Sequence, residues 1–562
     1  MAAYHDRVNP DLLRVIPRTA GCVLEIGCGA GALGAAFKRR APQCRWIGVE
    51  LDADAAAQAR GRIDHVVAGD AQALAAEQLG VEPGGADAVI YGDVLEHMAD
   101  PWSVVKRHAA LLAEGGLVLA CIPNVAHWSV LRELLQGKWT YAEEGLLDRT
   151  HLRFFTLEGI RALFEGAGLV VHDVRPRVFH RERARAFAKA LAPALAALGI
   201  EREAFFARST ALQYIVRAGR KPADRPLLLQ AMTLAPVAAC NDVRVALPCE
   251  ALATQPGVRV AIKERGAELH LGDGVEDKIF LWQRPILRWS DSLPSLRRLI
   301  ERGYVIVVEF DDHPKVWPEI AANDYLNYRG AHAVQTATEE LAALFRDFNP
   351  EVALFPNAID ELPPLRSRDG PEVTLFFGAL NREKDWAPFM PALNAALRAA
   401  GERVSVTVVH DRAFHDALAT GRKRFHPTLP YADYLRLLGS ADISLLPLRE
   451  DEFTRMKSDL KFIESAAHGA VALASPTVYA RTLRDGVTGM IFRTAEEFGE
   501  RLRALIADPM RRRALAAAAW DYVRRERMLS SQIGRRLAWY RELCSRREEL
   551  TRRLRERVPQ LA

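Results

Sequence analysis

The chain has 562 residues, a net charge of +5, 49% hydrophobic and 26% charged residues, a balance typical of ordinary globular proteins. One hydrophobic core does not extend over this length, so three or four folded units are expected. The seven cysteines form no CxxC pair and no cysteine–histidine cluster with zinc-ligand spacing, which excludes a disulfide scaffold and a zinc-finger class.

The amino-terminal residues Met1 to Asp6 lack the basic and apolar regions of a secretory signal. Nowhere do about eighteen apolar residues follow one another, as a membrane-spanning helix requires. We therefore expect a cytoplasmic protein.

From Gly21 onward, short apolar runs alternate with alanine- and leucine-rich helical patterns, which predicts a parallel sheet covered by helices. The expected strands are Cys22–Ile26, Trp46–Glu50, His65–Ala68, Ala88–Tyr91, Leu117–Ile122 and, closing the unit, Ala211–Val216. The fold class is therefore α/β, with a Rossmann-like domain over residues 1–220. The polar, proline-bearing segment from Ala218 to Pro226 is the best linker candidate, and the linker is placed at residues 221–228.

Gly27, Gly29 and Gly31 lie between the first expected strand and a helix, where missing side chains allow a sharp turn and close approach of a ligand. The run from Gly29 to Gly34 also fits the dinucleotide fingerprint, with Glu50 placed to bind a ribose in either case, so an NAD-linked oxidoreductase is one alternative. Glu25, at the end of the strand, would repel a pyrophosphate but tolerate a cationic sulfonium group. This charge favours S-adenosylmethionine over NAD.

Two further acidic residues follow strands of the same domain. Asp70 follows the third expected strand and Asp93 the fourth, at the sheet edge where ligands bind in such folds. With these residues, the segment from about Gly21 to Arg177 is similar to class I methyltransferases. The run from Gly145 to Thr156 resembles a stretch found in members encoded with cell-surface polysaccharide genes.

The resemblance implies a site for S-adenosylmethionine. Gly27, Gly29 and Gly31 would hold the amino-acid end of the donor, Glu50 the ribose and Asp70 the adenine, while Glu25 and Asp93 would line the pocket. Methyl transfer to a hydroxyl needs a base that removes the proton, and a neutral histidine suits this near pH 7. His151 is the first candidate and His97 the second; hydrogen-bonded loop histidines are the alternative for each.

A second and a third alternating series follow the linker. Expected strands are Val243–Ala246, Lys278–Trp282, Val305–Phe310, Ala333–Gln335 and Val352–Phe355, and then Val373–Phe377, Val404–Val409, Ile443–Leu446 and Val471–Ala474. They predict two Rossmann-like lobes, residues 229–360 and 361–510, with a ligand-binding cleft between them.

Cationic and acidic residues in the third series suit a sugar nucleotide. Gly378 ends a strand and is followed by Arg382 and Lys384, which could hold a diphosphate. Lys461 and Glu464 are three residues apart on an expected helix and so share one face. Together they could bind the phosphates and the ribose of one nucleotide.

This region resembles the carboxy-terminal half of GT-B glycosyltransferases of the retaining, group-1-like type, and the likeness extends faintly back to about Val243. In that family two glutamates lie eight residues apart on a helix; Glu464 matches the second, but Met456 occupies the first position. Asp459 could substitute for the missing carboxylate, or this half could be a non-catalytic glycan-binding module. The family needs no metal, and we predict none, although the adjacent Asp311 and Asp312 would suit a divalent cation.

Residues 511–562 form a basic tail with fifteen arginines and six acidic residues. Apolar residues recur among the arginines as expected for helices with one apolar side. The tail either packs on the body of the protein or contacts an anionic membrane surface or a phosphate-bearing, lipid-linked acceptor. No nucleic-acid-binding motif accompanies the charge, so nucleic acid is not an expected partner.

The sequence thus predicts a bifunctional cytoplasmic enzyme, possessing an S-adenosylmethionine-dependent methyltransferase and a glycosyltransferase that uses a nucleotide-diphosphate sugar. The expected acceptor is a glycan or lipid-linked oligosaccharide of the cell envelope, and peripheral attachment at the inner face of the membrane would follow from the tail.

Overall fold

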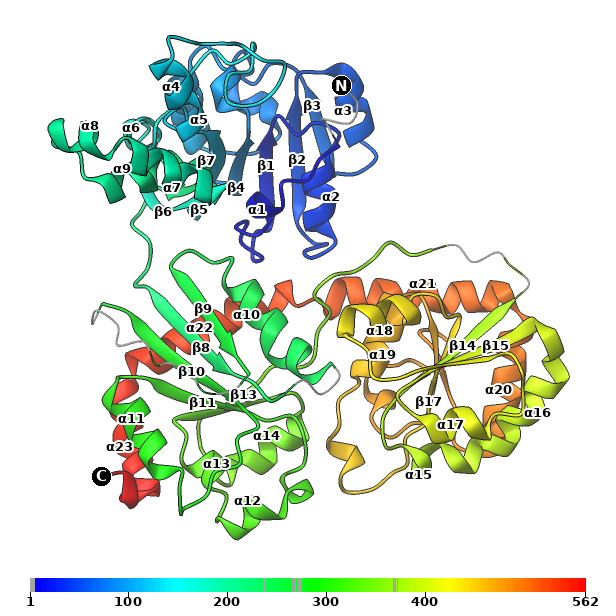
Figure 1. Ribbon diagram of the computed structural model, residues 1–562. Coiled ribbons are helices and arrows are strands. Elements are labelled where there is room, and N and C mark those ends of the chain that lie inside the picture. The colour runs from blue at the N-terminus through cyan, green and yellow to red at the C-terminus, as the bar shows by residue number, and fades with distance from the viewer. Residues whose placement is uncertain are drawn as a thin grey trace. The chain divides into compact units, whose positions relative to one another are not determined.

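The computed structural model describes residues 6–235, 239–264, 266, 269, 275–366, 370 and 372–562. The chain divides into two compact units, Met1–Arg225 with Ala253–Gly257 and Pro226–Leu252 with Val258–Ala562. The first unit contains one parallel-type sheet and the second contains two (Figure 1).

The first unit is built on a seven-stranded sheet in the order β3-β2-β1-β4-β5-β7-β6. Strands β1 to β5 are parallel, and β7 is antiparallel to β5 and β6. The strands are β1 (Cys22–Ile26), β2 (Arg45–Glu50), β3 (His65–Ala68), β4 (Ala86–Gly92), β5 (Leu112–Pro123), β6 (Val170–Val178) and β7 (Ala211–Gly219). The helices are α1 (Pro10–Leu13), α2 (Ala32–Lys38), α3 (Ala53–Ala59), α4 (Pro101–Ala109), α5 (Trp128–Leu135), α6 (Leu157–Gly166), α7 (Arg181–Ala190), α8 (Ala192–Ala197) and α9 (Arg202–Thr210).

Both faces of this sheet are buried, which explains the nearly continuous apolar runs of its strands. Leu24 and Ile26 of β1 belong to one hydrophobic cluster, while Val23 of the same strand belongs to another. Strands β2 and β3 lie on one side of β1 in the sheet, and β4 and the later strands lie on the other. Because the strand order reverses between β1 and β4, a crevice is expected at the carboxyl ends of these two strands.

All six strands predicted for this unit are present. β6 was not predicted because it is the edge strand of the sheet and mostly half-exposed, with the polar residues His172, Asp173 and Arg175 interrupting the apolar pattern. An edge strand needs only one paired side and one partly buried face, so its sequence signal is weak.

The first lobe of the second unit contains a parallel sheet in the order β13-β12-β11-β10-β8-β9. Its strands are β8 (Leu227–Met232), β9 (Val258–Lys263), β10 (Asp277–Gln283), β11 (Val305–Glu309), β12 (Ala333–Thr336) and β13 (Val352–Leu354). Its helices are α10 (Leu247–Leu252), α11 (Leu293–Glu301), α12 (Pro318–Ala322), α13 (Leu326–Arg329) and α14 (Glu339–Arg346).

The strand predicted at Val243–Ala246 is wrong. Residues Asp242–Ala246 form a π-helical turn that leads into α10, and the first strand is β8, which takes the last two residues of the predicted linker. The guanidinium of Arg244 pairs within this turn with the buried carboxylate of Glu309, at 2.9 Å. Tertiary pairing of this kind overrides the strand preference of the two valines that flank Arg244.

The second lobe contains a parallel sheet in the order β16-β15-β14-β17-β18-β19. Its strands are β14 (Val373–Gly378), β15 (Val404–Val409), β16 (Lys423–His426), β17 (Ile443–Leu446), β18 (Val471–Ala474) and β19 (Met490–Ile491). Its helices are α15 (Glu383–Trp386), α16 (Met390–Ala400), α17 (Arg412–Ala417), α18 (Tyr431–Leu438), α19 (Leu460–Ala467) and α20 (Ala495–Ala507).

The basic tail forms three helices, α21 (Pro509–Glu526), α22 (Ser530–Ser545) and α23 (Arg547–Arg557). The apolar side of α21 joins the cores of the second lobe, whereas α22 and α23 pack on the first lobe (Figure 1). Every apolar residue expected on one side of these helices lies in or against a core cluster: Leu515, Trp520, Tyr522, Leu529, Ile533, Leu537, Trp539, Tyr540, Leu543, Leu550 and Leu554. The tail is therefore an integral part of the second unit.

Many tail arginines bind backbone carbonyl groups of the body. Arg512 donates to the carbonyls of Leu505 and Ile506 at the end of α20, at 2.6 and 3.0 Å. Arg527 and Arg557 donate to other main-chain oxygens, of Asn357 and Ala331 respectively, at 2.9 and 2.8 Å. Many of the positive side chains of the tail therefore bind groups of the protein itself.

Candidate functional sites

The turn after β1 has a backbone that only glycine adopts readily. Gly27, Gly29 and Gly31 have φ values of 70°, 53° and 78°. A Cβ atom on Gly27 would lie 2.5 Å from a methyl group of Val94, in the turn after β4. The carboxyl ends of β1 and β4 therefore approach each other as closely as missing side chains allow.

Glu50, at the end of β2, is tied to this turn. Its Oε2 accepts a hydrogen bond of 2.7 Å from the amide of Gly29, and its Oε1 accepts one of 2.9 Å from the amide of Asp52. The side chain is buried. The structure thus brings together the predicted glycine turn and the predicted ribose-binding carboxylate.

Glu25 lies beneath the same turn. Its Oε2 accepts a 2.8 Å hydrogen bond from the indole Nε1 of Trp46. Burial raises the pKa of Glu25 to about 8, with Glu50 adding to the shift and Trp46 opposing it. This carboxyl group is therefore mostly protonated at neutral pH, so its charge discriminates between ligands only as the pH approaches 8.

Asp70 and Asp93 differ in their surroundings. Asp70 follows β3, lies near the surface and accepts a hydrogen bond of 2.9 Å from the amide of Gln72. Asp93 follows β4 with a φ of 57° and accepts a hydrogen bond from the side chain of Gln213. Burial raises the pKa of Asp93. Asp93 directly precedes Val94, the residue packed against Gly27.

The two candidate bases lie side by side although 54 positions separate them in the chain. His97 ends a short 3-10 turn (Leu95–His97) after β4, and His151 lies in the loop before α6. Their ring centroids are 4.8 Å apart, with an edge-on arrangement at 72°. The turn after β4 thus places His97 three residues beyond Val94, and the loop before α6 brings His151 against it.

Hydrogen bonds indicate which nitrogen of each ring carries a proton. The hydroxyl of Thr150 donates to Asp148 at 2.7 Å and so accepts from Nδ1 of His97 at 3.0 Å. Nδ1 of His151 donates to the carbonyl of Leu146 at 3.2 Å. Burial lowers the pKa of His151, and nearby His97 lowers it further. In neutral rings, Nε2 of both histidines keeps a free lone pair.

Glu96 lies beside this pair. It was not predicted as a site residue, although it directly precedes His97. Its Oε1 lies 4.0 Å from Nε2 of His151, and its Oε2 is buried without a hydrogen-bond partner among the described residues. Burial, reinforced by Asp93, raises the pKa of Glu96 well above its ordinary value. The ligand atoms of Glu96, His97 and His151 lie within 4.8 Å of one another, a spacing that could also hold a metal ion.

In the second unit, Lys461 and Glu464 of α19 form an ion pair of 3.2 Å. Glu464 is fully buried, and its Oε1 accepts a 2.9 Å hydrogen bond from the hydroxyl of Tyr431. The ammonium group of Lys461 donates to the hydroxyl of Tyr434 at 2.9 Å. Desolvation alone would lower the pKa of Lys461, but Glu464 and Tyr434 outweigh it and raise that pKa.

The tyrosines were not predicted, although their spacing of three on α18 places them on one face. Tyr434 also explains Gly378, because a Cβ atom there would lie 2.6 Å from its ring. Arg382 pairs with Asp385 at 3.1 Å, and Lys384 is exposed. Gly378, Lys461 and Glu464 therefore meet around Tyr431 and Tyr434.

Asp459 faces a different group of residues. Its carboxylate pairs with Arg527 of the tail and accepts a 2.7 Å hydrogen bond from the hydroxyl of Thr482. These residues, with Thr338, Ser458 and others, line a cavity of about 690 Å³. Asp459 is thus held by the tail, whereas Lys461 and Glu464 are held by α18.

Met456, which stands at the position of the missing carboxylate, makes a packing contact. The side chain of Met456 packs against the core of the first lobe, and its carbonyl accepts a 3.1 Å hydrogen bond from the hydroxyl of Thr338. The adjacent acids of that lobe both have cationic partners, Asp311 with Arg284 at 2.6 Å and Asp312 with Lys457 at 3.2 Å.

Comparison with known proteins assigns the two units. The family described as "Methyltransferase domain" matches residues 1–174, and the family described as "Glycosyl transferase-like" matches residues 387–537. A ubiquinone biosynthesis O-methyltransferase of Pseudomonas paraeruginosa is 35% identical over 179 residues, which are 30% of this chain and 75% of that protein. The chain belongs to the methyltransferase family.

A further relative and two solved structures are similar to parts of the chain. The ubiquinone biosynthesis O-methyltransferase of Cupriavidus pinatubonensis is 35% identical over 31% of this chain and 72% of its own length. Sucrose-phosphate synthase from Thermosynechococcus elongatus is 15% identical with a TM-score of 0.41, over 57% of this chain and all of that one. The Anabaena protein HepE in complex with UDP-glucose is 14% identical with a TM-score of 0.40, over 56% of this chain and 99% of that one.

The methyltransferase domain is followed by a unit with two Rossmann-like lobes that matches a glycosyl transferase-like family, as the sequence predicted, and the chain is an enzyme with both kinds of domain. Membership of the methyltransferase family implies S-adenosylmethionine as the methyl donor. No helix within the described residues is long and apolar enough to span a membrane.

Proposed function

We propose that this bifunctional enzyme methylates a sugar hydroxyl with S-adenosylmethionine and transfers a sugar from a nucleotide-diphosphate donor, during synthesis of a cell-surface polysaccharide or lipid-linked glycan. The observation that carries the proposal is that one chain holds both a glycine turn with a histidine pair and a lysine–glutamate pair held by tyrosines. Joining both activities in one chain raises the local concentration of the shared glycan.

The residues around the glycine turn fit the methyl donor. Gly27, Gly29 and Gly31 would hold its amino-acid end, and Glu50, already bonded to this turn, its ribose. Asp70 would bind the adenine, with Glu25 and Asp93 lining the pocket. When bound, the donor supplies an electrophilic methyl group on a cationic sulfur.

Nε2 of His151 accepts the proton of the acceptor hydroxyl as the oxygen attacks, and His97 is the second candidate for this role. The hydrogen bond from Nδ1 of His151 to the carbonyl of Leu146 fixes the ring and leaves Nε2 unprotonated. The lowered pKa of His151 keeps the ring neutral at physiological pH. The carboxyl of Glu96, whose pKa is raised by burial, faces the same space and is placed to orient the hydroxyl.

In the glycosyltransferase, Lys461 with Arg382 and Lys384 would bind the diphosphate, and Glu464 would bind ribose hydroxyls. A cation beside the leaving diphosphate stabilises the charge that develops on it during transfer. Asp459 is proposed as a further donor contact, although its carboxylate is paired with Arg527.

The affinity for S-adenosylmethionine is expected to rise with pH toward 8 and then level off. Because the pKa of buried Glu25 is raised to about 8, the carboxyl group is neutral below this pH and negative above it. A cationic ligand binds the negative form, so affinity changes by at most about tenfold per pH unit. Calorimetric titration of wild type and Glu25→Gln between about pH 6 and pH 9 measures the effect.

In this titration the affinity of Glu25→Gln should change less with pH than that of wild type. The affinity for S-adenosylhomocysteine, whose sulfur is uncharged, should also change less with pH. An equally steep profile in the variant would show that another group is responsible. The same titration with NAD tests the alternative of an oxidoreductase, which predicts binding of NAD in place of both sulfur compounds.

Mass spectrometry of glycans from cells with and without this chain tests the function as a whole. Loss of both a sugar residue and a methyl group supports the proposal. Loss of the methyl group alone would support the second candidate, a methyltransferase with a non-catalytic glycan-binding module, which the packing of Met456 at the expected carboxylate position favours.

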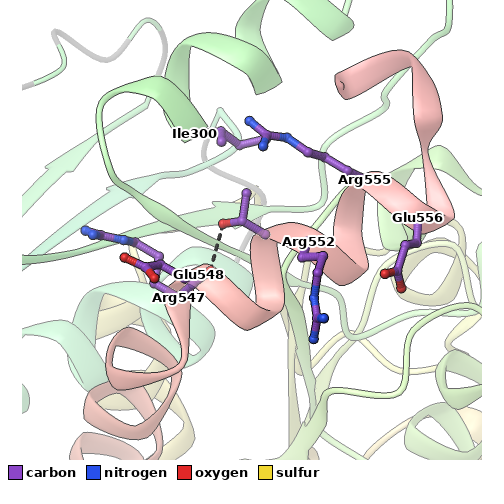
Figure 2. A pocket seen from close by; sticks show the side chains of 7 residues that line it. Ile300, Arg547, Glu548, Arg552, Arg555 and Glu556 are labelled. Carbon is purple, nitrogen blue, oxygen red and sulfur yellow. Dashed lines mark hydrogen bonds between the residues drawn. The ribbon is translucent and has the colours of Figure 1, made fainter.

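The tail offers limited charge for a peripheral contact with an anionic membrane at the cytoplasmic face. Arg547, Arg552 and Arg555 of α23 line a surface pocket of about 560 Å³ together with Glu548, Glu556, Thr551 and Ile300 (Figure 2). Figure 2 shows that Arg552 points away from Arg547 and Arg555, and two glutamates share this surface. Membrane contact would therefore depend on a few side chains.

Arg552→Ala/Arg555→Ala is expected to weaken binding to vesicles rich in phosphatidylglycerol by about 2 kcal/mol, at about 1 kcal/mol per arginine near the surface. Co-sedimentation measures it, with the exposed Arg412 and Arg436 of the second lobe replaced together as the control. Equal sedimentation of both double variants would exclude this surface as the membrane contact.

A further inference from the structure

The loop between α5 and α6 exposes aromatic side chains beside the histidine pair. Trp139 is 37% exposed and Tyr141 is 48% exposed, in a segment without a helix or strand of its own. Such rings are usually buried in a core, because each removes a large apolar area from water when it packs. Exposed aromatic residues gathered at one place indicate a binding surface.

These rings continue as a ladder from the surface to the candidate base. Ring centroids are 6.4 Å apart for Tyr141 and Trp139, 5.2 Å for Trp139 and Phe154, and 6.2 Å for Phe154 and His151. All three contacts are edge-to-face, at 80°, 78° and 67°. An edge-to-face contact covers a face of only one ring of the pair, and both outer rings are partly exposed, which leaves part of their surface for a ligand to stack on.

The backbone of the loop holds these rings in place. The amide of Ala142 donates to the carbonyl of Leu147 at 2.9 Å, and the amide of Arg149 donates to the carbonyl of Ala142 at 3.1 Å. This closed turn directly follows Tyr141. The two exposed rings are therefore held in position before a ligand arrives, which reduces the entropy lost on binding.

The charge of the loop decides what kind of ligand fits. Within residues 138–149, around the exposed rings, Glu143, Glu144 and Asp148 outnumber Lys138 and Arg149, and Arg149 is paired with Glu143 at 3.0 Å. Arg153, further along the loop, donates to the carbonyl of Ala99 at 3.1 Å. An acidic rim disfavours phosphate groups and anionic lipid surfaces. Its carboxylates accept hydrogen bonds from hydroxyl groups, while the aromatic faces suit an apolar surface of C–H groups. A pyranose ring offers both.

We propose that Trp139 and Tyr141 form a stacking platform for a pyranose ring of the methyl acceptor, and that the ladder through Phe154 sets which hydroxyl reaches His151. This inference rests on the proposed methylation of a sugar and adds the surface that recognises it. Trp139 and Tyr141 are specificity-determining residues here, and take no part in the proton transfer.

The test uses the full chain and glycan isolated from cells that lack it, with radiolabelled S-adenosylmethionine as the methyl source. Trp139→Ala is expected to raise the KM for this glycan about tenfold, the loss of one stacked ring, with a smaller change in kcat. Trp139→Phe keeps a ring and should restore most of the affinity. Trp102→Ala is the matched control, because Trp102 is 46% exposed in the same domain but lies outside the ladder.

Saturation-transfer NMR with methyl α-D-glucopyranoside and methyl α-D-mannopyranoside measures binding to the platform without methyl transfer. Contact with ring C–H groups should be seen in wild type and Trp102→Ala and lost in Trp139→Ala. An unchanged KM and unchanged contact in Trp139→Ala, alongside active methylation, would overturn the platform while leaving the proposed function intact. Catechol or phosphatidylglycerol vesicles binding in place of the glycosides, in a manner that depends on Trp139, would overturn it equally.

Absence of methyl incorporation into the glycan by wild type is a separate outcome. It would contradict the proposed function itself, since no platform variant is involved in that measurement. The affinity of each variant for S-adenosylhomocysteine shows that the domain is folded, because the platform residues lie outside the glycine turn.

Discussion

Replacing His151 with alanine is expected to lower the rate of methyl transfer by about 10²- to 10⁴-fold, the usual contribution of a general base. The effect should lie in kcat, because His151 acts on the proton of the acceptor and lies outside the glycine turn that would bind the donor. Single-turnover methyl transfer measures it, and titration with S-adenosylhomocysteine should give an affinity close to that of wild type.

His97→Ala separates the two candidate bases. The rings touch at 4.8 Å, so loss of His97 should disturb His151 and lower the rate, but by less than loss of His151 itself. Thr150→Val is the matched control, because it removes the hydroxyl that accepts from Nδ1 of His97 and leaves both rings in place. Nearly full activity in His151→Ala with none in His97→Ala would assign the base to His97.

The glycine turn was predictable because its signal is local. Three glycines at alternate positions after an apolar strand have few structural uses, and the positive φ values at all three show why no other residue stands there. Glu50 and Asp93 follow from the same reasoning, since they end strands whose order in the sheet is fixed by the parallel topology. Carboxyl ends of neighbouring parallel strands meet at one edge.

The partners of the site residues were not predictable, because they depend on contacts between distant segments. Asp459 lies two residues before Lys461, yet Arg527, which is 68 positions away, binds its carboxylate. The valines around Arg244 have the pattern of a strand, but the buried pair with Glu309 favours a helical turn. No periodic pattern in the sequence marks Glu96. Only its burial beside His151 identifies it as a candidate site residue.

Replacing Lys461 with alanine is expected to lower sugar transfer by about 10²- to 10³-fold, the cost of removing one group that stabilises developing charge. The change also leaves the fully buried carboxylate of Glu464 without its cation, beside the hydroxyls of Tyr431 and Tyr434. An uncompensated buried charge destabilises the fold, so thermal unfolding of the second unit should shift to lower temperature. Consumption of nucleotide sugar and unfolding followed by circular dichroism measure the two effects.

The double variant Lys461→Ala/Glu464→Gln distinguishes binding from folding. Removing the charge of Glu464 as well should recover most of the lost stability, because a neutral amide can remain near Tyr431 without a cation. Sugar transfer should stay low, since the cation for the diphosphate is still missing. Arg436→Ala, at an exposed position with no role in the site, is the control and should leave transfer close to that of wild type. Recovery of transfer together with stability would show that Lys461 supports only the packing of Glu464, and that another cation binds the donor.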